Sequence, residues 1–465
     1  MTDVSSSLAQ PGGLPAPAAD RALPGRANLA LALKLAAAGV GYLFMILLAR
    51  AMSLEGFGTV AFFLNLALLM SVLGSFGQQM ALLRFVPPLA AAGDLGQIRL
   101  LLRRAALRAG SGTLIVSALL LVLFMSGTPA ARGVPGGISL RDMLLGLALV
   151  PLTGWLELQA HLARGFHLLA LALAPREILW RIGVGAAVAT AWFMQGGTPV
   201  SSGIVLALLA GGLIVAGAAQ ARILWRRTGL GATAVPAPDP QVERDWRTHE
   251  RAFWVSSVSN MFLANASVIV VGLSAGAGAA ALFFAANRLA MVLGFVMISN
   301  NLALAPMLSQ AWKDGRREPL RRLALRATWR AFVPTAALGV ALAVGAPSVL
   351  SLFGPEFPDA SGMLRLLILA ILLDAGGGAS DILLNMCGRQ RAAMRASLAS
   401  LLAAAVLLTG GTALGGAFGC ALAVVVASGL RKALFWWVCL RQLGIRTDIL
   451  AARDLRREPR SAGAA

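Results

Sequence analysis

Long apolar segments follow one another along almost the whole chain, which restricts it to a small set of membrane folds. Twelve segments can be delimited, at 28–50, 58–80, 109–126, 141–163, 177–194, 201–221, 252–273, 279–306, 327–353, 360–386, 397–413 and 414–430, the last with an aromatic extension to about 439. About 20 helical residues cross the hydrocarbon core of a bilayer. Most of these segments are long enough, so we predict an all-α, polytopic membrane protein with about twelve transmembrane helices.

The connectors between these segments alternate in charge. Those that follow the even-numbered segments are rich in arginine, whereas the connectors at 195–200, 274–278, 354–359 and 411–413 contain no lysine or arginine. Basic connectors stay on the cytoplasmic side of a membrane. Both termini are therefore predicted to be cytoplasmic, and the number of spans to be even. A miscounted helix would break the alternation.

Composition excludes several classes of protein. Hydrophobic residues make up 58% of the chain and charged residues 13%, which is more apolar surface than a soluble domain can cover. The formal charge of +20 would suggest a nucleic-acid partner, but the cations lie in connectors between spans and not along one folded face. Topology and attraction to anionic membrane lipids explain them better.

No metal, disulfide or catalytic site is predicted. Cys387, Cys420 and Cys439 have no paired spacing, and the three histidines are scattered. The chain shows no phosphate-binding loop, no serine elbow and no paired carboxylates in an accessible loop. The predicted outer connectors are short, which disfavours a membrane glycosyl polymerase or ligase. We expect a protein that is not an enzyme and that uses no cofactor.

The longest polar interruption, 225–251, divides the chain into six spans and six spans. We expect a disordered cytoplasmic tail at 1–26, an N-terminal six-helix bundle at 27–224, a cytoplasmic linker at 225–251, a C-terminal six-helix bundle at 252–440 and a basic cytoplasmic tail at 441–465.

The two halves also resemble each other in sequence. Pro87 is predicted to end one span, and Pro306 ends the matching span 219 positions later. Four arginines, at 99, 103, 104 and 108, recur at 317, 321, 322 and 326, each 218 positions on. The pattern favours a duplication. A half with six spans keeps its orientation when duplicated, so the repeats are predicted to be parallel, with a substrate path between them. The arginines themselves suit a basic amphipathic helix on the inner leaflet, and recruitment of anionic lipid head groups is compatible with that role.

Charged and amide residues inside the spans are costly in hydrocarbon and mark candidate sites. The set comprises Lys34, Glu157, Arg288, Arg365, Asp374 and Asp381, with the amides Asn260 and Asn287 as further candidates. For Lys34 and Arg288, a cation facing a cavity and a structural ion pair both remain open, and Asp374 is able to neutralise either. Arg365 suits snorkelling to the outer interface. Helix–helix hydrogen bonding is the alternative for the amides. Glu177 and Arg181, one turn apart, are interpreted as a surface pair.

Three consecutive glycines, Gly376, Gly377 and Gly378, follow Asp374 inside the tenth segment. Together they cost about 3 kcal/mol of helix propensity relative to alanine. Two interpretations remain open: close packing between helices, or a broken helix that exposes its backbone beside a carboxylate.

Several motifs in order resemble one family. They are Gly56-Phe57-Gly58, Gly74-Ser75-Phe76-Gly77 and Leu83-Arg84-Phe85-Val86-Pro87 in the first half, and Leu304-Ala305-Pro306, Lys313-Asp314-Gly315, the run from Val349 to Phe357 and the run from Leu384 to Gln390 in the second. They resemble the oligosaccharide flippases that export polysaccharide repeat units, within the superfamily of multidrug and polysaccharide exporters. The resemblance covers nearly all of 28–440, and Pro88 departs from it where an acidic residue is common.

The resemblance implies two six-helix bundles around a central cavity in a bacterial inner membrane. It implies that a polyprenyl-diphosphate-linked oligosaccharide is moved from the cytoplasmic to the outer leaflet for O-antigen (lipopolysaccharide), capsule or exopolysaccharide synthesis. A polysaccharide polymerase and a chain-length regulator are the partners expected. Lys34, Arg288 and Arg365 would then bind the anionic substrate, Asp374 would couple transport to an ion, and Glu157, Asp381, Asn260 and Asn287 are secondary candidates.

Two other functions remain open. One is a multidrug or cation antiporter on the same fold, whose cavity should be acidic and aromatic. The other is a non-transport subunit of a polysaccharide assembly complex. Neighbouring genes for glycosyltransferases and a polymerase would favour flipping. The sequence does not identify the sugar, the polymer or the coupling ion.

Overall fold

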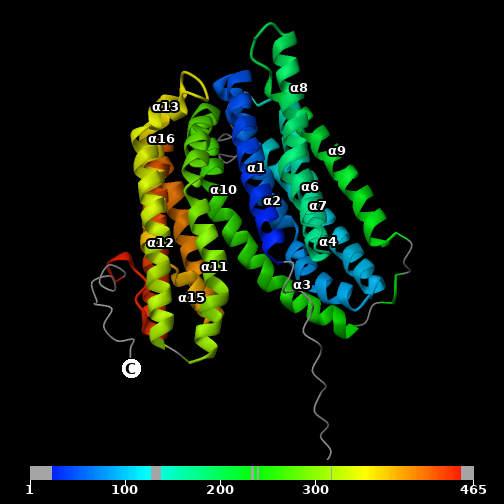
Figure 1. Cartoon of the computed structure of the whole chain (residues 1–465). Helices are drawn as coiled ribbons and strands as arrows, with labels where there is room; N and C mark the ends of the chain where they lie inside the picture. Colours follow the sequence, from blue (N-terminus) through cyan, green and yellow to red (C-terminus); the bar gives the residue numbers. More distant parts are fainter. Residues whose placement is uncertain (1–22, 127–137, 232–234, 238–239, 316, 452–465) are drawn as a thin grey trace, which may run out of the picture.

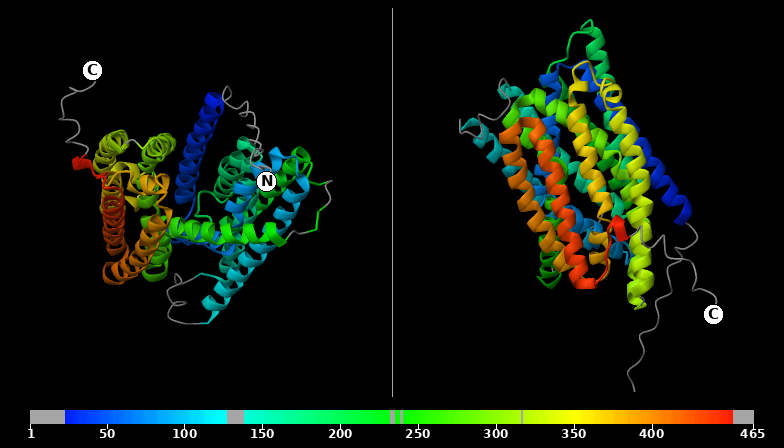
Figure 2. Two further views of the ribbon diagram at one scale, coloured as in Figure 1. Left: turned by 90° about the horizontal axis from the view of Figure 1, so that it is seen from below. Right: turned by 90° about the vertical axis from the view of Figure 1, so that its left-hand side faces the viewer.

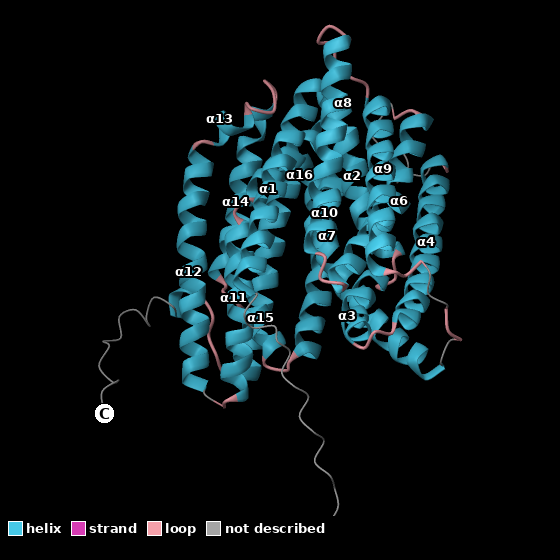
Figure 3. Cartoon of the chain, turned by 45° about the vertical axis from the view of Figure 1, so that its right-hand side comes forward, coloured by secondary structure: helices cyan, strands magenta, loops and turns pink. Residues whose placement is uncertain are grey.

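A computed structural model describes residues 23–126, 138–231, 235–237, 240–315 and 317–451. The described residues form helices joined by short loops and contain no strand (Figures 1 and 3). Residues 1–22 and 452–465, which make up most of the two predicted tails, lie outside the described residues.

The described residues of the first half form eight α-helices, of which α7 is short, and one π-helix. They are α1 (Leu23–Ala51), α2 (Leu54–Gly74), α3 (Gln78–Ala91), α4 (Leu95–Met125), α6 (Leu140–Gly165), α7 (Leu169–Leu173), the π-helix η1 (Ala174–Leu179), α8 (Trp180–Met194) and α9 (Ser202–Thr228). We call this bundle the N-lobe. In it α7, η1 and α8 form one continuous rod, and α2 and α3 form another that is interrupted between Ser75 and Gly77.

The second half contains α10 (Pro240–Met291), α11 (Gly294–Lys313), α12 (Arg317–Val344), α13 (Ala346–Leu350), the 3-10 turn η2 (Phe357–Ala360), α14 (Ser361–Gly376), α15 (Ser380–Met386) and α16 (Gln390–Leu443). Two of these elements, α10 and α16, each consist of two helical arms joined at a turn. The turn of α10 lies at Gly276 (φ 90°, ψ 175°), and that of α16 lies at Gly415 and Gly416. We call α11 to α16, together with the second arm of α10, the C-lobe.

The number of spans agrees with the sequence. Nine stretches of the described chain are long and apolar enough to cross a membrane, and α1 adds a shorter apolar stretch, 36–51. Two of the nine, 264–301 and 390–443, each contain a turn and therefore two arms, which brings the total to twelve. The twelve-helix prediction is confirmed. The turn at Gly415 and Gly416 lies a few residues after the connector predicted at 411–413.

The breaks in the helices support an internal repeat. The interruption before α3 is followed by a similar one before α11, 216 positions later (294 − 78). The prediction that Pro87 and Pro306 end their spans is wrong, because both lie inside helices, α3 and α11, that continue to Ala91 and Lys313. An internal proline removes one backbone hydrogen bond, and packed neighbours in a bundle allow the helix to continue.

We use "basic end" for the end of the molecule that carries the arginine-rich connectors, at the bottom of Figure 1. At the opposite end the two lobes are in contact. The Arg50 side chain donates to the carbonyl oxygens of Leu352 at 2.7 Å and Ser351 at 3.2 Å. Phe57 of α2 packs edge-on against Phe284 and Phe357, with centroid distances of 5.8 and 5.9 Å. These contacts close the opposite end.

At the basic end the first arm of α10 reaches across to the N-lobe (Figure 2, left). Glu250 on this arm accepts from Arg104 at 3.0 Å and Arg108 at 2.9 Å, and Trp254 donates to the Leu73 carbonyl at 2.8 Å. Within the described chain, α11, α12, α15 and α16 make no extensive contact with α1 to α9. The lobes are therefore joined here mainly by α10.

This arm changes two expectations. Residues 240–251, predicted to belong to a linker, form the first turns of α10 and pack on the N-lobe. Arg104, predicted to lie on an amphipathic surface helix, is buried in its ion pair with Glu250. The sequence shows the charge of such a residue but not the arm that covers it.

Candidate functional site

Besides the Glu250 ion pairs, the described helices carry two groups of charged side chains that bear on a substrate or ion site, one in each lobe. The first, the N-lobe charge cluster, comprises Glu157 and His161 of α6, Arg164 at the end of α6, Arg176 and Glu177 of η1, and Arg181 of α8. Arg176 connects the two carboxylates: its Nε atom is 2.6 Å from Glu157 Oε1, and its Nη1 atom is 2.8 Å from Glu177 Oε1. Arg181 Nη1 lies 3.3 Å from Glu177 Oε2.

The cluster depends on a local irregularity in the rod formed by α7, η1 and α8. Between α7 and α8 the chain adopts six residues of π-helix, with Pro175 in its first turn. π-Helical turns are rare and occur frequently at functional sites. Here the turn carries the adjacent residues Arg176 and Glu177, which pair in two directions, toward α6 and along α8. The interpretation of Glu177 and Arg181 as a surface pair is wrong, because both side chains are largely covered and belong to this buried network.

Arg288, on the second arm of α10, lies beside this cluster but has no carboxylate partner among the described residues. Its guanidinium sits 4.9 Å from the centre of the Phe284 ring, and its Nε atom is buried without a hydrogen-bond acceptor. Its backbone carbonyl accepts from the Tyr42 hydroxyl of α1 at 2.6 Å. The backbone of Arg288 is thus held by the hydrogen bond from Tyr42, while no described carboxylate pairs with its guanidinium.

Arg181 approaches the same stretch of α1 from the N-lobe. A Cβ atom added at Gly41, next to Tyr42, would lie 3.7 Å from the Arg181 guanidinium. Arg288 is close enough to Arg181 and Glu177 to interact with both electrostatically. Four cations (Arg164, Arg176, Arg181 and Arg288) therefore face two carboxylates (Glu157 and Glu177), which leaves a net charge of +2 (4 − 2). The junction of the lobes around α1 is electropositive.

The second group, the C-lobe charge cluster, comprises Asp374, Asp381, Arg431 and Lys432. Asp374 pairs with Arg431. Lys432 Nζ lies 3.6 Å from Asp374 Oδ1 and 3.5 Å from Asp381 Oδ1, and it donates to the Gly378 carbonyl at 2.8 Å. Two carboxylates and two cations balance, so this cluster is neutral.

The C-lobe cluster surrounds the glycine run of the tenth span. There α14 ends at Gly376, α15 begins at Ser380, and Gly378 has φ +74°. Of the two interpretations left open for the glycine run, the broken helix is present in the structure. Close packing also applies, since a Cβ atom at Gly378 would lie 2.0 Å from the Thr447 carbonyl oxygen. The Thr447 hydroxyl in turn donates to the Gly377 carbonyl at 3.0 Å. This part of the predicted C-terminal tail is thus packed against the break.

A small polar pocket of about 50 Å³ adjoins the break. Its lining includes Asn300 and Asn301 of α11, Thr328 of α12, and Asp374, Asp381 and Lys432 of the cluster. A volume of this size holds more than one water molecule, or a small cation. Oxygen ligands of these kinds are those that hard cations prefer.

The remaining predicted residues are spread over both lobes. Lys34, on α1 toward the basic end, is exposed and makes no ion pair in the described part of the chain. Arg365 is exposed and donates to the Ala343 carbonyl of α12 at 3.2 Å. Asn260 is exposed on the first arm of α10, and Asn287 is half-buried next to Arg288. Asp374 neutralises neither Lys34 nor Arg288, because Arg431 and Lys432 take its charge.

The sequence reasoning missed Arg431 and Lys432. We ended the twelfth apolar segment at 430, just before these two cations, although the aromatic extension continues to about 439. A charged pair between two apolar stretches was the signal. It should have marked the interior of a helix that continues to Leu443.

The fold is shared with solved membrane transporters. The chain is similar to an inward-facing multidrug resistance MATE family transporter of the MOP superfamily, with 14% identity and a TM-score of 0.68 over 93% of this chain and 100% of that one. It is similar to the lipid II flippase MurJ in an inward closed conformation, with 13% identity and a TM-score of 0.64 over 88% and 87% of the two chains. A MOP superfamily transporter from Pyrococcus furiosus, described by the reverse polarity of its binding pocket, has 14% identity and a TM-score of 0.55 over 92% and 96%.

Family models extend this result. No curated protein sequence matches the chain. The model MatE matches residues 253–409, and the model described as polysaccharide biosynthesis protein matches residues 28–312. The latter match covers more than half of the chain and includes nearly all of the N-lobe, α10 and α11. The protein is therefore a multi-pass membrane protein that belongs to the polysaccharide biosynthesis protein family and shares the fold of the MATE transporters and of MurJ.

Proposed function

We propose that this transporter flips a polyprenyl-diphosphate-linked oligosaccharide from the cytoplasmic to the outer leaflet of a bacterial inner membrane, with both termini in the cytoplasm. The product would supply O-antigen, capsule or exopolysaccharide synthesis, with a polymerase and a chain-length regulator as partners downstream. The family of the chain and the fold shared with a lipid II flippase support a lipid-linked substrate.

The observation that carries the proposal is the uncompensated charge of Arg288 at the junction of the lobes. A half-buried guanidinium at membrane depth without a carboxylate is costly, and such intramembrane charges mark candidate ligand sites. The excess of +2 around Arg288 suits a diphosphate, which carries negative charge and presents several acceptor oxygens. Lys34, exposed toward the basic end of α1, would meet the anion as it enters, and Arg365 would act near the opposite end.

The contacts between the lobes support an inward-facing state. The opposite end is closed by Arg50 and Phe57, whereas at the basic end α10 provides the main bridge among the described elements. Outward release would require the first set of contacts to part and the helices of the basic end to approach. A membrane potential that is negative inside favours outward movement of an anion by about 2.3 kcal/mol per charge per 100 mV.

Asp374 is our candidate for ion coupling. It lies beside a polar pocket at a helix break, pairs with Arg431 and shares Lys432 with Asp381. Protonation of Asp374, or a cation bound in the pocket, would weaken its hold on Arg431. The break would then be free to change its geometry, which would link an ion gradient to movement of the C-lobe.

A multidrug antiporter that carries organic cations fits less well. The four carboxylates of the two clusters all pair with arginine or lysine, so none is left for a cationic drug. The uncompensated charge in the central region is positive.

Deletion of the gene followed by a leaflet-resolved assay of the lipid-linked intermediate tests the proposal. Flipping predicts that the intermediate accumulates facing the cytoplasm and that the intact chain restores outward display. Normal outward display in the deletion strain would reject the function. Loss of organic-cation efflux with normal display would instead assign the protein to drug export.

A further inference from the structure

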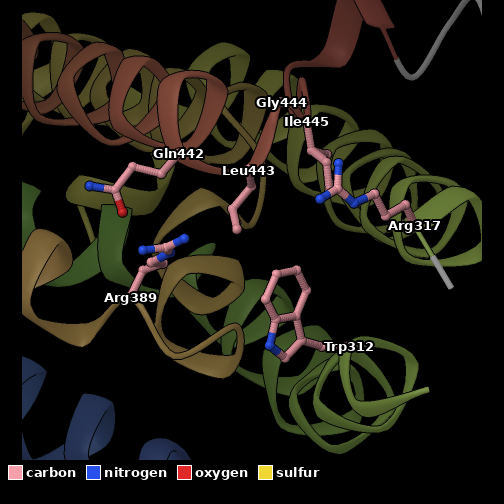
Figure 4. A pocket seen from close by; sticks show the side chains of 7 residues that line it. All are labelled: Trp312, Arg317, Arg389, Gln442, Leu443, Gly444 and Ile445. Carbon is pink, nitrogen blue, oxygen red and sulfur yellow. The ribbon is translucent and has the colours of Figure 1, made fainter. Parts of the chain in front are cut away.

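A second site lies at the basic end of the C-lobe, away from both charge clusters. It is a pocket of about 230 Å³ whose lining includes Trp312, Arg317, Arg389, Gln442 and Leu443. The end of α11, the start of α12 and both ends of α16 meet there, so the lining comes from helices that are far apart in sequence (Figure 4).

The pocket is cationic and its charges are free. Arg317 and Arg389 are exposed, and neither makes an ion pair among the described residues. The acidic neighbour of Arg317 on α12, Glu318, is already engaged by Arg321 at 3.1 Å and by Arg322 at 2.8 Å. Two guanidinium groups therefore remain available for an external anion.

The two arginines enter from different sides. Figure 4 shows the Arg389 guanidinium next to the Gln442 amide, whereas Arg317 lies beyond Leu443 and beside Ile445, with the Trp312 ring facing the space below Leu443. Guanidinium groups bind phosphate oxygens in a forked geometry, and an amide adds a neutral donor. A tryptophan at the end of a membrane helix is typical of the head-group level. Cations on two sides suit a group with two phosphates better than a single phosphate.

We propose that this pocket binds the phosphates of an anionic lipid head group at the membrane surface on the basic side. Basic pockets between transmembrane helices on that side are suited to head groups such as that of cardiolipin. The same chemistry is offered by the diphosphate of a lipid-linked sugar and by free diphosphate. The site is separate from Arg288, so the inference does not depend on the flipping of a substrate.

Native mass spectrometry of the full chain in detergent tests the site, with cardiolipin, phosphatidylglycerol and phosphatidylcholine as probes. We expect cardiolipin to bind most tightly and phosphatidylcholine most weakly. The double variant Arg317→Gln/Arg389→Gln should lose at least about tenfold in cardiolipin affinity, since two charge-assisted contacts are removed. The matched control Arg326→Gln/Arg395→Gln removes the same charge from the same two helices, at exposed positions outside the pocket, and should bind as the unmodified chain does.

Competition with inorganic diphosphate separates the sources. Displacement of bound cardiolipin by millimolar diphosphate, with no binding of diphosphate at lower concentration, supports a lipid site. Tight binding of diphosphate without any lipid preference assigns the same pocket to a soluble anion. Equal affinity in all three proteins, or an equal loss in both double variants, would overturn the site. If the double variant does not remain monodisperse, Arg389→Gln alone carries the test.

Discussion

The two charge clusters are built from the same residue types but differ in balance. In the C-lobe, Asp374 and Asp381 are matched by Arg431 and Lys432, and every charge has a partner. In the N-lobe and at its junction with α10, four arginines face two glutamates, and Arg288 has no carboxylate partner among the described residues.

The difference indicates a division of labour. A balanced cluster at a helix break holds a conformation, and a change in one charge, by protonation or cation binding, alters that hold. An unbalanced cluster instead attracts a ligand of opposite charge. The attraction between the two offsets the desolvation cost of the cluster when the ligand binds. We therefore infer that the N-lobe cluster and Arg288 recognise the substrate, whereas the C-lobe cluster responds to an ion.

The largest effect is expected from Arg288→Gln, which removes the uncompensated charge. Loss of hydrogen bonds to a charged phosphate costs about 1.5–3 kcal/mol, so export should fall about 10- to 100-fold. Arg288→Lys keeps the charge without the forked geometry and should fall less. The measurement is outward display of the lipid-linked intermediate in a complemented deletion strain, with Arg326→Gln as the control. If Arg288→Gln displays the intermediate at the level of the unmodified protein, Arg288 and the N-lobe charge cluster do not recognise the substrate.

Asp374→Asn removes one of the two carboxylates of the C-lobe charge cluster and would give this cluster a net positive charge. Arg431 would then lose its ion pair, and Lys432 would keep only Asp381. We expect gradient-driven transport to fall about tenfold while exchange at equilibrium persists. Proteoliposomes with and without an imposed proton or sodium gradient distinguish the two activities. Gradient-driven transport at the level of the unmodified protein would rule Asp374 out as the coupling residue.

The helix break can be tested with a matched pair of glycines. Gly378 and Gly388 both have φ +74°, but a Cβ atom would meet the Thr447 carbonyl only at Gly378, whereas it has open space at Gly388. Gly388→Ala should therefore cost about 1 kcal/mol of stability through backbone strain, and Gly378→Ala about 3 kcal/mol. Thermal unfolding in detergent measures both. Equal losses would mean that the contact with Thr447 does not shape the break.

The smallest effect is expected from Lys34→Gln. The side chain is exposed and unpaired in the described structure, so solvent screens its interaction with an anion. We expect about a two- to threefold rise in the substrate concentration needed for half-maximal transport, without a change in maximal rate. A loss as large as that of Arg288→Gln would instead place Lys34 beside the bound diphosphate.

Much of the fold was predictable from local pattern. Apolar length and alternating charge predicted the twelve helices. The glycine run beside Asp374 left a break and close packing both open, and the structure contains the break between Gly376 and Ser380. The helix ends at Pro87 and Pro306 were predicted wrongly, because packed helices tolerate a proline that an isolated segment would not.

Sequence by itself determined most of the side chains that are charged at membrane depth, because each one interrupts an apolar run and is costly there. Arg431 and Lys432 were missed because they follow the end assigned to an apolar segment. Only the tertiary structure decided which charges compensate one another. Asp374 and Arg431 are 57 positions apart, Glu157 and Arg176 are 19 apart, and each pairing depends on how neighbouring helices are rotated and packed. The same packing gives Arg288 no carboxylate partner within the described parts of the chain, since electrostatic compensation depends on distance in space, which a linear pattern does not encode.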